Sequence, residues 1–245
     1  MEEAAFAPAA PSSQAALAAA LLSMSGEQVR AVLAEPPARA FRWVEAAAAI
    51  GLAQGQVRLG RMLLAGEGTA ADPAAAVRWF AKAASAGDVE AMNMLGRCHE
   101  NGWGVNVDFA EAAVWFTRAA DAGDAWAEYN LGHLYLNGAG VARDAAHAVA
   151  LYRRAAVRGH ARAMNLVGRC LEHGWGEPAD PEQAADWYRR SAEGGYFRGQ
   201  YNHASALLAA GRREEAETWF ARALGGASPS SRAVMIDGLR ALGLL

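Results

Sequence analysis

The sequence has little of what secreted, metal-binding or nucleic-acid-binding proteins need. Its 245 residues include only two cysteines, Cys98 and Cys170, too few for a disulfide framework. The net charge of −3 argues against partners such as nucleic acid or an anionic membrane. Lysine occurs once, as Lys82 in the helical run WFAKAA, which excludes a phosphate-binding loop of the GxxxxGK type.

The amino-terminal stretch lacks the features of a targeting or membrane segment. Its apolar part, residues 15–22, is far too short to span a bilayer. Its first charged residues are Glu2 and Glu3, whereas a secretion signal begins with basic residues. We therefore expect a cytoplasmic protein without membrane insertion, with a disordered tail at residues 1–13.

The residues that are abundant favour helices. Hydrophobic residues make up 53% of the chain, alanine is frequent and only eight prolines occur. This composition also argues against a disordered chain.

Four sets of residues recur with a period of 36, which indicates a repeat protein. They are Gly60, Gly96, Gly132 and Gly168; Gly68, Gly104, Gly140 and Gly176; Asp72, Asp108, Asp144 and Asp180; and Gly87, Gly123, Gly159 and Gly195.

Each repeat reads as two helices, A and B. In the second repeat, Ala91, Leu95 and Cys98 form an apolar stripe along helix A. Asp108 is placed to cap the start of helix B, and Gly123 to end it in the left-handed conformation.

The first glycine set falls inside helix A, where each glycine costs about 1 kcal/mol relative to alanine. Their recurrence indicates that a neighbouring helix approaches too closely for a side chain. We expect the tryptophan of helix B to be that neighbour; it recurs as Trp79, Trp115 and Trp187.

The run AEYNLGHLYLNGAGVARDAAHAVALYRRAAVRGHARA resembles the Sel-1-like repeat, a relative of the tetratricopeptide repeat. The resemblance implies an all-α fold: a right-handed superhelical α-solenoid of stacked antiparallel helix pairs with capping helices at both ends. Trp219 follows Trp187 by 32 residues rather than 36, so the fifth repeat is shortened. The expected segments are N-terminal capping helices with a half repeat (14–52), four repeats (53–88, 89–124, 125–160, 161–196), the shortened repeat (197–227) and a C-terminal capping helix (228–245).

The cluster of Cys98, His99 and Glu100 looks at first like a metal or nucleophile site. Cys98 aligns with apolar residues of the other repeats, and consecutive helical residues point to different sides. Core packing therefore explains Cys98 better than metal binding, which needs three or four converging ligands.

Other enzyme signatures are missing. No HExxH motif occurs and the six histidines are scattered. Some cysteine-rich relatives of the resembled family have been linked to antibiotic hydrolysis or binding, but their paired cysteines are replaced here by Ala83, Ala84 and Ala91. We predict no catalytic residue, no cofactor and no metal.

The resemblance implies that the A helices line a concave wall that holds partner proteins. Polar and aromatic A-helix positions outside the core stripe match the composition of binding hot spots. The predicted partner-binding residues are Asn93, Arg97, Trp126, Tyr129, His133, Asn165, Arg169 and Tyr201. The alternative is that the tyrosines pack between repeats and the arginines are merely solvated.

Trp103 and Trp175 stand between two glycines in the turn from helix A to helix B and are possible loop contacts if exposed. Folding back onto the neighbouring turn is the alternative. The arginine pairs 153–154, 189–190 and 212–213 are expected on a solvated outer face.

The function predicted from these patterns is a non-catalytic bacterial scaffold or adaptor that binds a protein or peptide segment on its concave face. The alternatives are an enzyme, hydrolase-like, or a small-ligand sensor using the same groove, and a self-assembling structural module. As a scaffold, the chain is expected to be a monomer or a weak homodimer.

Overall fold

A computed structural model describes residues 13–244 and contains, over that range, fourteen α-helices and no strand. The expected tail at residues 1–13 lies outside the described residues except for Ser13, which caps the first helix. Every described helix is too short or too polar to cross a bilayer. The helices are α1 (Gln14–Ser23), α2 (Gly26–Leu33), α3 (Pro37–Ala49), α4 (Ala53–Ala65), α5 (Pro73–Ser85), α6 (Val89–Asn101), α7 (Phe109–Asp121), α8 (Ala125–Asn137), α9 (Ala145–Val157), α10 (Ala161–His173), α11 (Pro181–Glu193), α12 (Phe197–Ala209), α13 (Arg213–Gly226) and α14 (Pro229–Ala241).

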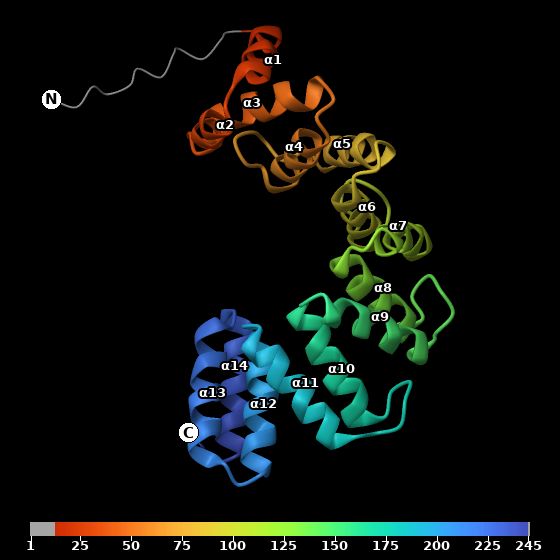
Figure 1. The fold of residues 1–245 in the computed structure, drawn as a ribbon, viewed down its shortest axis with the longest axis vertical. Coiled ribbons are helices and arrows are strands. Elements are labelled where there is room, and N and C mark those ends of the chain that lie inside the picture. Colours follow the sequence, from red (N-terminus) through yellow and green to blue (C-terminus); the bar gives the residue numbers. More distant parts are fainter. Residues whose placement is uncertain (1–12, 245) are drawn as a thin grey trace, which may run out of the picture. The chain divides into compact units, whose positions relative to one another are not determined.

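The helices form two compact units, one ending at Arg118 and the other beginning at Ala119. Figure 1 labels the helices in their order along the chain. In unit 1, α3, α4, α5 and α6 pack consecutively; in unit 2, α8 through α13 do the same. The A helices are α4, α6, α8, α10 and α12, and each is followed by its B helix. The predicted fold class, an α-solenoid of helix pairs, is confirmed.

The repeated aspartates and glycines delimit the helices as the sequence predicts. The Asp108 carboxylate accepts a hydrogen bond from the Glu111 backbone N–H at 2.9 Å, and Asp72, Asp144 and Asp180 cap α5, α9 and α11 in the same way. Gly123 has φ +91°, the left-handed conformation expected after helix B.

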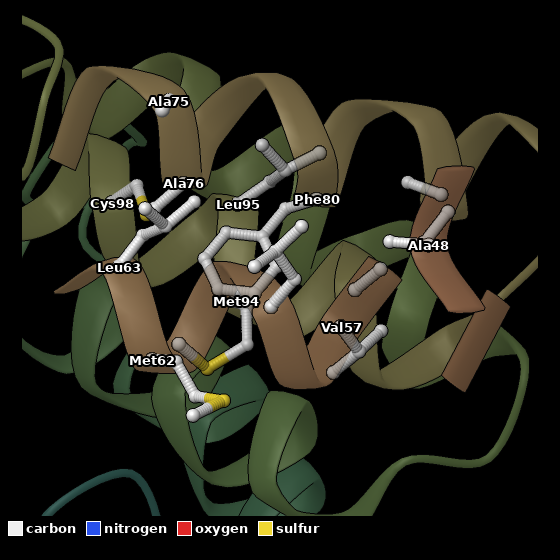
Figure 2. Packing of buried hydrophobic residues seen from close by; sticks show 14 of the residues in the cluster. Ala48, Val57, Met62, Leu63, Ala75, Ala76, Phe80, Met94, Leu95 and Cys98 are labelled. Atoms are coloured by element: carbon white, nitrogen blue, oxygen red, sulfur yellow. The ribbon is translucent and has the colours of Figure 1, made fainter. Parts of the chain in front are cut away.

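The core of each repeat forms where helix B packs on the helix A glycine. A Cβ on Gly96 would lie 2.5 Å from the ring of Phe116, and one on Gly168 would lie 2.6 Å from the ring of Tyr188. The prediction that tryptophan is this neighbour is wrong, because the ring belongs to the residue that follows it in the chain. Figure 2 shows the ring of Phe80, which fills the equivalent place in the first repeat. The ring lies among the apolar side chains of α4, α5 and α6.

Helix α14 packs against the last repeat. The last repeat has a short connection between its two helices, because only three residues separate α12 from α13, whereas seven separate α10 from α11. Leu239 of α14 is buried in one cluster with Leu207 and Phe220. The Arg232 Nε atom donates to the Leu224 carbonyl at 2.8 Å, which fixes the start of α14 beside the end of α13.

Candidate functional site: the A helices of unit 2

The six predicted partner-binding residues of unit 2 lie in two separate parts of its surface, an aromatic cluster and a groove. Those of α8 belong to an aromatic cluster, which we define as Trp126, Tyr129, His133, Tyr152 and His160. Those of α10 and α12, namely Asn165, Arg169 and Tyr201, line a groove bordered by α14.

The aromatic cluster is held together by edge-to-face ring contacts and a tilted contact between Tyr129 and His160. The Tyr129 ring centroid lies 4.6 Å from that of His133 and 4.9 Å from that of His160, and the Trp126 centroid lies 4.4 Å from His160. Such geometry matches the positive ring edges with the negative ring faces. Trp126 is 46% exposed and therefore presents this cluster at the surface.

His160 caps α10 in the place that Asp88 and Asp124 occupy at α6 and α8. Its Nδ1 atom accepts a hydrogen bond from the Ala163 backbone N–H at 3.1 Å, so Nδ1 carries no proton. The ring is 8% exposed, and its Nε2 atom has no partner among the described residues. Burial, aided by the charge of Arg162, lowers the pKa of His160 to about 4.

Arg162 connects the cluster to the next repeat. Its guanidinium lies 5.1 Å from the Trp126 ring centroid and 5.6 Å from that of Tyr196, both within cation–π range. Burial lowers the pKa of His133, and the charge of Arg169 lowers it further. The cluster is therefore neutral aromatic surface flanked by two permanent cations.

The second feature, called the α14 groove below, is an open cavity of about 530 Å³ lined by side chains of α10, α12 and α14. Arg169 and Arg198 supply its charge, and none of its lining residues is acidic. The Asn202 Nδ2 atom donates to the Asn165 Oδ1 atom at 2.8 Å, which joins α12 to α10 at the groove.

The arginines of unit 2 differ between the two kinds of helix. Arg162, Arg169 and Arg198, all on A helices, form no ion pair within residues 13–244. By contrast, seven arginines on the B helices or their caps pair with carboxylates: Arg153, Arg154, Arg158, Arg189, Arg190, Arg212 and Arg213. An exception on the B side is Arg222, whose guanidinium lies 4.7 Å from the Trp219 ring centroid.

The pair 153–154, expected on a solvated outer face, also forms ion pairs. The Arg154 Nε atom lies 2.9 Å from the carboxylate of Glu128, a fully buried residue that also binds Arg158 at 2.9 Å. The Arg153 Nη2 atom donates to both carboxylate oxygens of Glu177 at 2.9 Å. Arg154 and Arg158 join α9 to α8 within one hairpin, where the buried carboxylate requires paired cations. Arg153 joins this hairpin to the turn between α10 and α11 of the next.

In unit 1, Asn93 and Arg97 both lie on α6. Asn93 is buried, and Arg97 is half-buried with its guanidinium 5.0 Å from the Trp103 ring centroid. Arg169 lies over Trp175 in the same way, at 5.4 Å. Both tryptophans are half-buried against the cores of their units, so each indole folds back under the arginine of its own repeat.

The thiols are poorly suited to nucleophilic chemistry. Cys98 and Cys170 are fully buried among apolar side chains, as Figure 2 shows for Cys98. Burial raises the pKa of each thiol to about 11. Across the described residues, no three His, Cys, Asp or Glu side chains converge as metal ligands would.

Several contributors to the site are absent from the predicted set. Arg162 and Arg198 occupy the same register as Trp126, 36 residues apart, and this register was the available signal. The signal for His160 was that it replaces an aspartate cap. No periodic signal could indicate Ser230 or Val234, because α14 lies outside the repeats.

Comparisons with known proteins agree with this architecture. The Sel1 repeat family model matches residues 11–52, 53–88, 89–124, 127–160 and 161–196. No curated protein matches the sequence. A Sel1 repeat protein from Oxalobacter formigenes is 31% identical with a TM-score of 0.76, and the match covers 88% of this chain and 89% of that one.

A second similar structure is c5321, a protective antigen present in uropathogenic Escherichia coli strains that displays an SLR fold. It is 27% identical with a TM-score of 0.71 over 87% of this chain, which spans only 47% of that protein. A putative Sel1 repeat protein from Klebsiella pneumoniae, 20% identical with a TM-score of 0.56 over 84% of this chain and 99% of that one, shares the fold. With family matches over most of its length, this chain belongs to the Sel1 repeat family.

Proposed function

We propose that the chain is a non-catalytic interaction module that binds a segment of a partner protein along its A helices, in the bacterial cytoplasm. Sel1 repeats typically serve as scaffolds for protein interactions. A row of rigid helices limits the conformational entropy lost when such a partner binds.

The observation that supports this proposal is the uneven pairing of arginines in unit 2. B-helix arginines are largely neutralised by carboxylates, whereas Arg162, Arg169 and Arg198 are not. An unpaired arginine beside exposed aromatic surface, as Arg162 is beside Trp126, has the composition of an interface hot spot.

The test is affinity capture from lysate of the native organism, quantified by mass spectrometry. The variant Trp126→Ala with Arg162→Gln should lose its partner by about tenfold or more, because both groups are surface-accessible. The control is Val157→Ser, which removes an apolar side chain that is 83% exposed at the end of α9, a B helix.

Two results would contradict the proposal. One is equal partner recovery by wild type and by the α8–α10 variant at unchanged helicity. The other is loss of the partner in the Val157→Ser control alone.

A further inference from the structure

The α14 groove has a charge and shape that specify the chemistry of an occupant. It is an open cavity of about 530 Å³ in unit 2, lined by side chains of α10, α12 and α14. Its lining combines two cations with amides, hydroxyls and apolar side chains and contains no acidic residue.

Arg169 and Arg198 are the two cations. Neither forms an ion pair with a described residue. Arg198 is exposed, and Arg169 is half-buried over Trp175, which restricts the motion of its guanidinium. Guanidinium groups bind carboxylates in a planar, often bidentate geometry, so the groove is complementary to an anionic side chain.

The amide and apolar parts of the groove suit a peptide better than a small anion. Asn202 is half-buried and donates one N–H to Asn165, which leaves its Oδ1 and second N–H available to a peptide backbone. Val234 of α14 is 73% exposed at the same groove and offers an apolar contact.

We propose that the α14 groove binds an acidic peptide segment of a partner protein, in which an Asp or Glu side chain lies next to an apolar one. The carboxylate binds at Arg169 and Arg198, and the apolar side chain packs against Val234. This inference rests on the proposed function and adds to it the location and the chemistry of the partner.

The test uses two fluorescein-labelled, carboxy-amidated decapeptides: Gly-Ser-Glu-Glu-Leu-Glu-Glu-Leu-Ser-Gly and its counterpart with glutamine at every glutamate. Fluorescence anisotropy with the full chain should show binding of the acidic peptide that weakens several-fold from 50 to 500 mM salt. The glutamine peptide should bind about tenfold more weakly or not at all.

The variants Arg198→Gln and Arg169→Gln should each weaken the acidic peptide by about tenfold. Arg222→Gln is the matched control, because it removes an arginine of unit 2 that also lacks a carboxylate partner but lies outside the groove. Thermal unfolding checks that each variant is folded. Arg198→Gln keeps the test valid should the half-buried Arg169 prove necessary for folding.

Failure to bind the acidic peptide, equal affinity for both peptides, or unchanged affinity in both groove variants would overturn the inference. So would a wild-type dimer in sedimentation that Arg198→Gln converts to monomer, because a second copy would then occupy the groove. If lysate capture depends on Trp126 but not on these two arginines, the proposed function stands and this inference fails.

Discussion

The stability of unit 2 should fall as the pH drops from 7 to 5, and His160 should account for most of the loss. Its pKa is lowered from 6.5 to about 4 in the folded chain, chiefly by burial. The folded state therefore binds fewer protons than the unfolded state between these values. Stability is full above pH 6.5 and is lost as the pH falls toward 4.

The magnitude follows from the two pKa values. Protonation of the His160 imidazole in the unfolded chain alone lowers the free energy of unfolding by about 2 kcal/mol between pH 7 and pH 5. A proton on Nδ1 would also break the hydrogen bond from the Ala163 N–H that begins α10. Of the groups around the imidazole, Arg162 is a cation that disfavours its protonation, and the neutral rings of Trp126 and Tyr129 supply no negative charge to offset this.

The assay is urea unfolding, followed by circular dichroism at pH 7 and pH 5, for wild type and for His160→Asn. Asparagine caps a helix without titrating, so the variant should lose much less stability on acidification. It should keep a smaller pH dependence, because burial also lowers the pKa of His133 and His203.

The matched control is Asp88→Asn, the same repeat position in α6, which leaves His160 in place and should keep the wild-type difference. Equal losses in wild type and His160→Asn would refute the reasoning. A proton NMR titration that places the pKa of His160 near 6.5 would refute it as well.

Three further predictions concern the repeat core. Gly168→Ala should lower the free energy of unfolding in urea by about 2 kcal/mol, because the added Cβ would lie 2.6 Å from a ring. The control Gly225→Ala has open space around the added Cβ and should raise the free energy of unfolding by up to about 1 kcal/mol. Equal effects of the two substitutions would contradict the account. Tyr152→Phe should be neutral or stabilising by about 1 kcal/mol in thermal unfolding, because its buried hydroxyl has no partner among the described residues, and a clear loss would reveal a missed hydrogen bond. Cys98 and Cys170 should react with Ellman's reagent only on unfolding, and rapid labelling of the native chain at pH 8 would contradict their burial.

The periodic sequence predicts the helix pairs well, because a residue that recurs every 36 positions has the same local role in every repeat. Asp108 and Gly123 show this: both act within their own turn and need no knowledge of distant contacts. The ring that fills the helix A glycine was assigned to Trp115 instead of Phe116. Adjacent residues on a helix differ by about 100° in direction, and periodicity cannot tell which of the two points inward.

The candidate site was predictable only in part. Asn165 and Tyr201 share a register, Arg169 follows Asn165 by four residues, and the structure places all three at one groove. The wall formed by α14 could not be derived, because this helix lies outside the period. Nor could the sequence show which arginines are paired, since the bond between Arg154 and Glu128 depends on how α8 and α9 pack against each other.

The most direct test of the central claim is hydrogen–deuterium exchange of the chain with and without its captured partner. Binding along the A helices predicts slower exchange in α8, α10 and α12, the helices that carry Trp126, Arg169 and Arg198. Slower exchange confined to the B helices α9, α11 and α13 would contradict the account.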